Sequence, residues 1–185
     1  MRTCWPLEDD DRLMIEYHDT EWGKPVHDDR KHFEYLALDA FQAGLSWRTV
    51  LNKRENFRKA FSNFNPKVIS KYDNRKIKSL LRDAGIIRNR LKIHGTVRNA
   101  KAFLEIQKEF GSFDKFIWQF TNYKTIQNKW KSIKKLPAKT KESDVMSLAL
   151  KKRGFTFVGS TICYAYMQAA GMVNDHLVGC ARHRN

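Results

Sequence analysis

The chain of 185 residues carries 35 Lys or Arg against 20 Asp or Glu, which gives a formal net charge of +15. Its apolar content of 42% predicts a folded protein with a substantial core, and no apolar run is long enough to cross a bilayer. The excess positive charge favours polyanionic partners, nucleic acid first and an anionic membrane second, although a Lys-rich solvated surface is the simpler alternative.

The N-terminal composition and the cysteines favour a cytoplasmic protein. The chain turns acidic almost at once, from Glu8 onward, so it does not begin like a signal peptide. Cys4, Cys163 and Cys180 are an odd number without a disulfide-like spacing, which favours reduced thiols or metal ligands. We expect residues 1–185 to form a single monomeric domain that does not bind membranes.

Apolar residues at helical spacing, with capping residues between them, predict an all-α protein. A first short helix is expected after a cap among Asp9 to Asp11. Further helices are expected at about 33–41, 47–61, 66–72, 74–84, 90–110, 113–120, 145–152 and 160–170, with caps at Ser46, Asn65, Asp73, Asn89, Ser112 and Ser143 and stops at Gly44, Gly85, Gly154 and Gly171. The basic segment 121–141 is interpreted as a surface loop, and no segment predicts a strand.

The stretch from Asp39 to Trp47 joins two of these helices at a sharp corner. Asp39 flanks the apolar stripe of the first helix, so its carboxylate is expected at the edge of the buried surface. Gly44 ends that helix, Leu45 lies at the bend, and Ser46 caps the next helix. Such a corner can present an acid, an indole and a protruding Leu to one volume. The alternative is an ordinary corner with a solvated Asp39 and a core Trp47.

A second candidate element is a helix, a Gly-containing turn and another helix at about 73–104. The turn holds Gly85, and basic residues flank it at Arg82, Arg88, Arg90 and Lys92. Backbone amides of such a turn, together with the positive end of the following helix, can hold a phosphate without reading any base. Further Lys and Arg cluster at 53–59, 129–135 and 151–153, although a run of charge is usually a solvated face.

Four potential metal ligands lie near the two ends of the chain, namely Cys4, His18, His176 and Cys180. Two thiolates and two imidazoles would complete a closed, structural zinc site that staples the termini together. A His-x-x-x-Cys pair also occurs by chance, so the alternative is buried cysteines and hydrogen-bonded histidines.

Aromatic residues and one acid are candidates for a ligand pocket. Tyr17, Trp47 and Asp39, with Trp5 or Trp22, would bind a cationic alkylated purine far better than a neutral one, because ring faces and a carboxylate both attract positive charge. No Ser/His/Asp set or Gly-rich phosphate loop competes with this interpretation, and no Lys stands out as a nucleophile.

Six motifs together resemble the 3-methyladenine DNA glycosylase I family, in order and over essentially the whole chain. They are Tyr-His-Asp-Thr-Glu-Trp-Gly at 17–23, Gln-Ala-Gly-Leu-Ser-Trp at 42–47, Lys-Arg-Glu-Asn at 53–56, Asp-Ala-Gly-Ile-Ile-Arg at 83–88, Lys-Lys-Arg-Gly-Phe at 151–155 and Asn-Asp-His at 174–176. The resemblance implies a two-lobed helix-hairpin-helix fold whose N- and C-terminal segments share one structural zinc, bound by the four residues named above. It also implies that Tyr17 and Trp47 stack on the base, and that Gly44 and Leu45 enter the gap in the duplex.

Two positions depart from the family pattern. Asp39 stands where the family typically has a base-recognising Glu, and Met14 stands where relatives have an aromatic residue. The shorter carboxylate reaches the base only if its helix lies closer or a water intervenes. These departures concern the substrate range more than the fold.

The sequence therefore predicts a monofunctional DNA glycosylase that hydrolyses the N-glycosidic bond of 3-methyladenine in double-stranded DNA. Asp39 is expected to act as a recognition and electrostatic group rather than as a strong general base. The alternative is a zinc-stapled helical protein that senses alkylated DNA without cutting it, and Asp39 in place of Glu keeps this alternative open.

Overall fold

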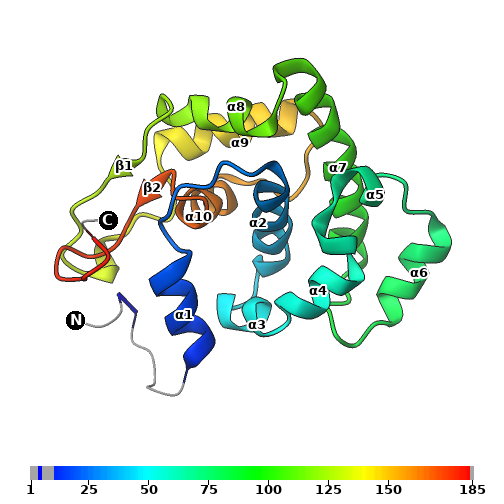
Figure 1. The fold of residues 1–185 in the computed structure, drawn as a ribbon, viewed down its shortest axis with the longest axis horizontal. Coiled ribbons are helices and arrows are strands. Elements are labelled where there is room, and N and C mark those ends of the chain that lie inside the picture. Colours follow the sequence, from blue (N-terminus) through cyan, green and yellow to red (C-terminus); the bar gives the residue numbers. More distant parts are fainter. Residues whose placement is uncertain (1–3, 6–10, 184–185) are drawn as a thin grey trace.

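The computed structural model describes residues 4–5 and 11–183, and this part of the chain is mainly helical (Figure 1). The α-helices are α1 (Arg12–Thr20), α2 (Asp29–Gln42), α3 (Trp47–Asn52), α4 (Arg54–Ala60), α5 (Pro66–Ile69), α6 (Asn74–Arg82), α7 (Arg90–Phe110), α8 (Phe113–Trp118), α9 (Lys141–Lys152) and α10 (Ser160–Ala169). The short elements are the 3-10 helices η1 (Ser62–Phe64), η2 (Gln119–Thr121) and η3 (Ile133–Lys135) and the strands β1 (Ile126–Gln127) and β2 (Val173–Asn174). The predicted all-α class is confirmed, with one small pair of strands added.

Most of the predicted helix starts are confirmed by side-chain caps. In each confirmed case the capping side chain accepts a hydrogen bond from a backbone N–H of the first turn, which would otherwise lack a partner. The confirmed caps are Asp11, Ser46, Asn65, Asp73, Asn89 and Ser112. Asp9 and Asp10, the other candidates for the first cap, lie outside the described residues.

Several predicted boundaries are wrong. Helix α2 begins at Asp29, capped by Asp28, rather than at about 33, and α5 ends at Ile69 rather than at about 72. The helix expected at 47–61 is divided at Lys53 into α3 and α4. Helix α6 ends at Arg82, so Gly85 lies within the following turn and does not end the helix. Helix α9 begins earlier than expected because Thr140 caps it, and Ser143 completes a reciprocal capping box with Thr140.

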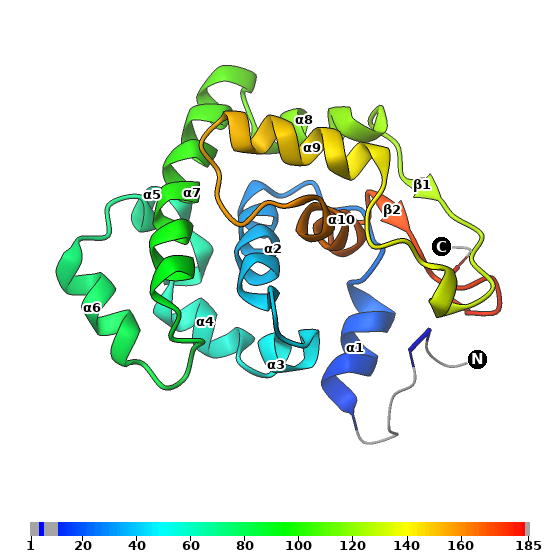
Figure 2. The same cartoon turned by 180° about the vertical axis from the view of Figure 1, so that it is seen from behind.

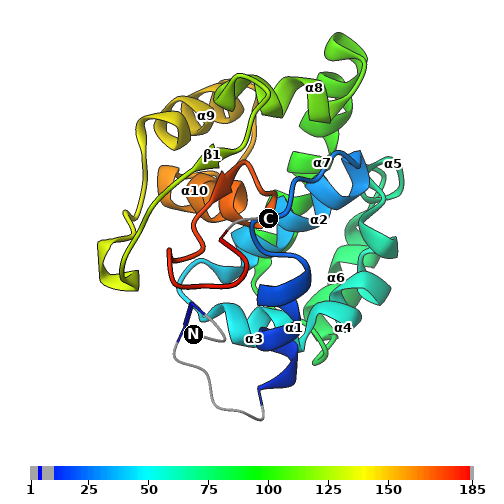
Figure 3. The same cartoon turned by 60° about the vertical axis from the view of Figure 1, so that its left-hand side comes forward.

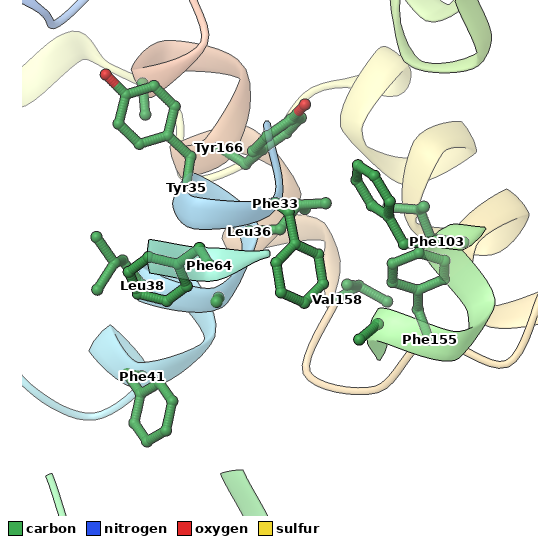
Figure 4. Packing of buried hydrophobic residues seen from close by; sticks show 14 of the residues in the cluster. Phe33, Tyr35, Leu36, Leu38, Phe41, Phe64, Phe103, Phe155, Val158 and Tyr166 are labelled. Carbon is green, nitrogen blue, oxygen red and sulfur yellow. The ribbon is translucent and has the colours of Figure 1, made fainter. Parts of the chain in front are cut away.

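Helix α2 is the centre of the fold, with α10 on one side and α7 on the other (Figures 1 and 2). Residues 32–41 of this helix are all buried, and a helix that is buried all round belongs in a core. Figure 4 shows Phe33 beside Phe103 of α7, with ring centroids 5.2 Å apart and nearly perpendicular planes. Because α2 carries Asp39, the candidate acid lies on a helix that is packed within the core.

A smaller apolar cluster joins α1 to the C-terminal segment, which lie close together in Figure 3. Its buried members are Cys4, Met14, Tyr17, Trp22, Leu51, Leu177 and Cys180. The segment 121–141 is not a plain surface loop, because β1 pairs in parallel with β2 and the register sets Ile126 opposite Val173. Trp130 and Leu136 of the same segment pack against the cluster.

The turn after α10 requires a glycine. Gly171 has φ +66°, and a Cβ atom there would lie 2.1 Å from the carbonyl carbon of Lys24. This close approach docks the segment after α1 against the end of α10. None of the described helices is long and apolar enough to traverse a membrane.

Candidate functional site

A cavity of about 310 Å³ lies where α1, α2, α3 and α10 meet. It is lined by Trp5, Met14, Tyr17, Trp22, Asp39, Gln42, Trp47, Leu136, Ala165 and Gln168. The structure therefore brings together the acid and all the aromatic residues that the sequence suggested for a pocket.

Aromatic rings form most of one side of this cavity. Tyr17 and Trp47 have ring centroids 5.1 Å apart with planes inclined by 46°, and Trp5 is stacked near Tyr17 at 6.4 Å. Trp22 is buried, tilted against Trp5 at 4.7 Å. These faces can enclose a flat ring and would favour a cationic one.

Asp39 is buried, with only 2% of its surface exposed, which rules out the solvated alternative. Its Oδ2 atom has no hydrogen-bond partner among the described residues. Burial raises the pKa of Asp39 well above its usual range, although the charge of Arg54 acts in the opposite direction. A buried acceptor without a partner is costly, so this carboxyl is poised for a donor or a positive charge supplied by a ligand.

Trp47 contributes a second buried polar atom, the indole Nε1, which has no partner in the part of the chain that the structure describes. An indole N–H normally finds an acceptor when it is buried. The cavity thus holds one unpartnered acceptor and one unpartnered donor, which can together orient a polar ring.

An ion-pair network lies between α1, α2 and α4. Arg54 is buried and donates from Nε to Glu34 at 2.6 Å and from Nη1 and Nη2 to Glu21 at 2.7 and 2.8 Å. The hydroxyl of Tyr35 also donates to Glu21, at 2.9 Å. Burial opposes ionisation, but hydrogen bonds and charge from Arg54 and Lys31 outweigh it and lower the pKa of Glu21 to about 2. The network ties the segment after α1, which leads to the cavity, to the central helix.

The four candidate metal ligands converge on one point. Cys4, His18, His176 and Cys180 are all buried, and their ligand atoms lie within 4.8 Å of one another. The Sγ–N separations are 3.5 Å for Cys4 and His176, 3.6 Å for Cys180 and His18, and 3.6 Å for Cys180 and His176. This group could hold a metal ion.

Neighbouring groups orient the two imidazoles and the two sulfurs. His18 Nδ1 lies 2.8 Å from Asp19 Oδ1, and His176 Nε2 lies 3.0 Å from the carbonyl oxygen of Trp22. The sulfur of Cys4 accepts from the backbone N–H of Leu177, at 3.3 Å. Such outer hydrogen bonds are typical of metal sites, since they fix the free ring nitrogen of each His ligand.

The corner after α2 is exposed. Gly44 has φ +82°, a left-handed conformation that favours glycine, and it follows the end of α2 as expected. Leu45 is 44% exposed, so its apolar side chain is open to solvent at the corner. Trp47, two residues further on, lies half-buried at the cavity wall.

The turn between α6 and α7 presents two of its predicted basic residues, and Arg82 just before it, to solvent. Arg88 and Arg90 are exposed, while Gly85 is half-buried and donates its N–H to Asp83 at 2.8 Å. Lys92 differs, because it is only 7% exposed and its ammonium donates to protein carbonyl groups. Its placement does not support the phosphate contact expected from the sequence.

Sequence reasoning missed four lining residues, namely Gln42, Leu136, Ala165 and Gln168. Gln168 is held by Asp175, which also accepts from the side chains of Asn128, Trp130 and Tyr164. Trp130 could have revealed that the basic segment around Leu136 packs against the core, because an indole in a basic segment is a candidate for burial.

A larger groove of about 640 Å³ lies between α6, α7 and the segment around Phe157. Its lining includes basic residues such as Arg98 and Lys101. Among the described residues, no buried polar atom that lacks a hydrogen-bond partner belongs to this lining. We therefore assign the functional site to the smaller cavity.

Solved structures place the fold in the class of DNA glycosylases. A crystal structure of 3-methyladenine DNA glycosylase I matches with a TM-score of 0.94 at 46% sequence identity, covering 99% of this chain and 100% of that one. A variant of 3-methyladenine DNA glycosylase I in complex with 3-methyladenine matches with a TM-score of 0.93 at 30% identity, covering 97% of this chain and 96% of that one.

Sequence comparison identifies the family. The model of the methyladenine glycosylase family matches residues 5–183, and the chain belongs to this family. It is 47% identical to the DNA-3-methyladenine glycosylase of Haemophilus influenzae over 180 residues, which are 97% of this chain and 97% of that protein.

Proposed function

We propose that this protein is a monofunctional DNA glycosylase that hydrolyses the N-glycosidic bond of 3-methyladenine in alkylated DNA and so initiates base excision repair. The observation that carries the proposal is the buried carboxyl of Asp39, which has an unpartnered oxygen and lines an aromatic cavity. The relatives at 46–47% identity are 3-methyladenine DNA glycosylases, and a more distant structural neighbour binds 3-methyladenine itself.

The cavity selects its ligand by charge. Methylation at a ring nitrogen makes the base in DNA a cation, so an ionised Asp39 gains an attractive partner where it otherwise has none. Stacking on Tyr17 and Trp47 adds attraction that a neutral adenine would receive more weakly. Trp22 closes the wall behind Trp5. An undamaged base is neutral, so its binding would leave the buried Asp39 without a positive charge as partner.

The exposed elements around the cavity hold the duplex. Backbone amides near Gly85, with Arg88 and Arg90, bind phosphates at the turn between α6 and α7. Leu45 then occupies the space that the extruded nucleotide leaves, and Gly44 allows the tight bend that presents it.

The reaction makes modest demands on the protein, since a cationic base is already a good leaving group. The bond between the sugar carbon and the base nitrogen breaks, the electron pair leaves with the base and makes it neutral, and water adds to the sugar and loses one proton to solvent. Asp39 holds the base and stabilises positive charge as the bond breaks. No Lys lines the described cavity, so a covalent lyase step has no candidate nucleophile there.

The metal that fits the ligand group best is one structural zinc ion. Bonds of about 2.3 Å to sulfur and about 2.0 Å to nitrogen in a tetrahedron separate S from N by about 3.5 Å, close to the separations of the four side chains. Cys4, His18, His176 and Cys180 would fill all four positions, which leaves none for substrate. Zinc would therefore join the chain ends rather than take part in hydrolysis.

We also propose that the protein acts as a cytoplasmic monomer. The four candidate metal ligands would by themselves complete a closed tetrahedral zinc site, so no ligand from a second subunit is needed. The cysteines are free thiols, which fits a reducing compartment.

A base-release assay tests the proposed function. Duplex DNA treated with a methylating agent is incubated with the protein, and free bases are separated and identified, with untreated duplex as the control. Release of 3-methyladenine, with strands that break only after alkali, is the expected result. Tight binding to the methylated duplex without release would instead identify a damage sensor.

A further inference from the structure

Lys92 connects the start of α7 to the end of α2. Its Nζ atom donates to the carbonyl oxygens of Phe41 at 2.9 Å and Ala43 at 2.6 Å, although 51 and 49 residues separate them in the chain. Carbonyl groups in the last turn of a helix have no partner within the helix, so the ammonium satisfies two groups that would otherwise lack one. A positive charge is also stabilised at the C-terminal end of a helix.

The carbonyl groups that Lys92 binds lie directly before the exposed corner. Ala43 is the last residue before Gly44 and Leu45, and Phe41 is two residues after Asp39. Lys92 itself belongs to the first turn of α7, where its N–H is capped by Asn89. One side chain therefore links the first turn of α7 to the last turn of α2 and to the corner that follows it.

A second lysine makes the reverse connection. Lys53, at the junction of α3 and α4, donates from Nζ to the carbonyl oxygens of Ala84 at 3.2 Å and Gly85 at 3.4 Å. Asn56 also donates to Gly85, at 3.4 Å. Lys53 therefore holds the turn between α6 and α7 from the junction of α3 and α4. Lys92 holds the end of α2 from the first turn of α7.

We propose that Lys92 and Lys53 are positioning residues, which fix the phosphate-binding turn to the corner that carries Leu45. When the turn binds the strand, the rigid link sets where Leu45 meets the base stack and where Asp39 meets the extruded base. The proposal rests on the proposed function of the cavity, and it assigns to Lys92 a role other than DNA contact.

This role makes predictions that differ from those of a phosphate contact and of a simple helix cap. A lysine that neutralises a phosphate contributes about 1 to the slope of log affinity against log salt. A positioning lysine leaves that slope unchanged but lowers the rate of excision, since displacement of a catalytic constellation by about 1 Å costs up to about 100-fold. A lysine that only caps α2 changes stability and leaves the excision rate of folded protein unaltered.

The test compares Lys92→Met with Lys108→Met, which removes an exposed charge from the same helix. Three quantities are measured below the unfolding temperature of each variant: the salt dependence of duplex affinity, the fluorescence of 2-aminopurine next to the damaged base, and the single-turnover release of 3-methyladenine. For Lys92→Met we expect an unchanged salt slope, a smaller fluorescence change on binding and a rate about 10-fold to 100-fold lower. Lys108→Met should keep the wild-type rate and fluorescence change.

Two further variants keep the test decisive. Lys92→Arg, which retains donors for both carbonyl groups, should recover part of the lost rate. Lys53→Met should show the same pattern as Lys92→Met, and it replaces that variant if Lys92→Met does not fold. A wild-type excision rate in the folded variants, or a salt slope reduced by about 1, would overturn the proposal. Wild-type protein that releases no base would instead count against the proposed function itself.

Discussion

Asp39 and Trp47 line the same cavity from α2 and α3, and each carries a buried polar atom that has no hydrogen-bond partner among residues 4–5 and 11–183. The two atoms are chemically complementary, since the carboxyl oxygen accepts and the indole N–H donates. Proteins seldom leave such groups unsatisfied unless a ligand completes them. The pair therefore explains how a pocket with mainly apolar walls can distinguish one orientation of a purine from another.

Replacing Trp47 should weaken the binding of the damaged base. Trp47→Ala removes a stacking face from the cavity, and such losses typically cost about 1 to 3 kcal/mol per base. The measurement is the affinity for duplex containing 3-methyladenine relative to undamaged duplex. Trp47→Phe, which keeps a stacking face without the N–H donor, is the matched control. Unchanged selectivity in the Ala variant would rule out stacking at this position.

Replacing Asp39 should reduce excision more than duplex affinity. In Asp39→Asn the cavity keeps its shape but loses the negative charge, so we expect single-turnover release to fall about 10-fold or more while binding to undamaged duplex is retained. Asp39→Glu keeps a carboxylate on a side chain one methylene longer and should retain more activity than the Asn variant. Equal rates for wild type and Asp39→Asn would make the acid a bystander.

The free protein should be stabilised by the same substitution at neutral pH. Because the pKa of Asp39 is raised in the folded state, its contribution to stability is present below the unfolded pKa of about 4 and is lost as pH rises through the folded value. Asp39→Asn should therefore unfold at a higher denaturant concentration than wild type at pH 7. The difference should shrink as pH falls toward about 4, and a destabilised Asn variant at pH 7 would contradict the assigned shift.

Glu21 should show the opposite pH dependence. Its pKa is lowered to about 2 through Arg54, so the ion pair contributes stability above the unfolded pKa of about 4.3 that is lost as pH falls through the folded value. Glu21→Gln should lower the free energy of unfolding at neutral pH by about 1 to 2 kcal/mol, since Glu21 is partly exposed and solvent screens the pair. The stabilities of the two proteins should converge as pH falls to about 2, and parallel pH profiles would contradict the prediction.

Metal analysis should find about one zinc per chain. Cys4→Ser and His176→Ala each remove one ligand, so both variants should lose the ion and unfold at lower temperature. Cys163→Ser is the matched control, because Cys163 is a buried thiol outside the ligand group. The zinc assignment would be wrong if the wild-type protein contained no metal and the two ligand variants unfolded at the same temperature as the wild type.

Local patterns in the sequence were the most predictable part of the fold. Caps such as Ser46 and Asn89 were recognised correctly because a cap depends on residues within one turn of the helix. The start of α9 was missed because Thr140 and Ser143 both fit the cap position, and their reciprocal hydrogen bonds decide between them.

The environment of the site could not be derived from local patterns. The burial of Asp39 depends on its neighbours in the packed core, and its charge environment depends on Arg54, which is distant in sequence. The same holds for Lys92, because its carbonyl partners at the end of α2 lie 51 and 49 residues away in the chain. The resemblance to a family joined Cys4, His18, His176 and Cys180 in advance, but it linked neither Asp39 to Arg54 nor Lys92 to α2.

Two consecutive residues of α1 serve two different sites. Tyr17 faces the cavity, while His18 belongs to the group formed with Cys4 and Cys180. A change at either thiol would therefore reach the cavity wall through the backbone of α1, although neither thiol lines the cavity.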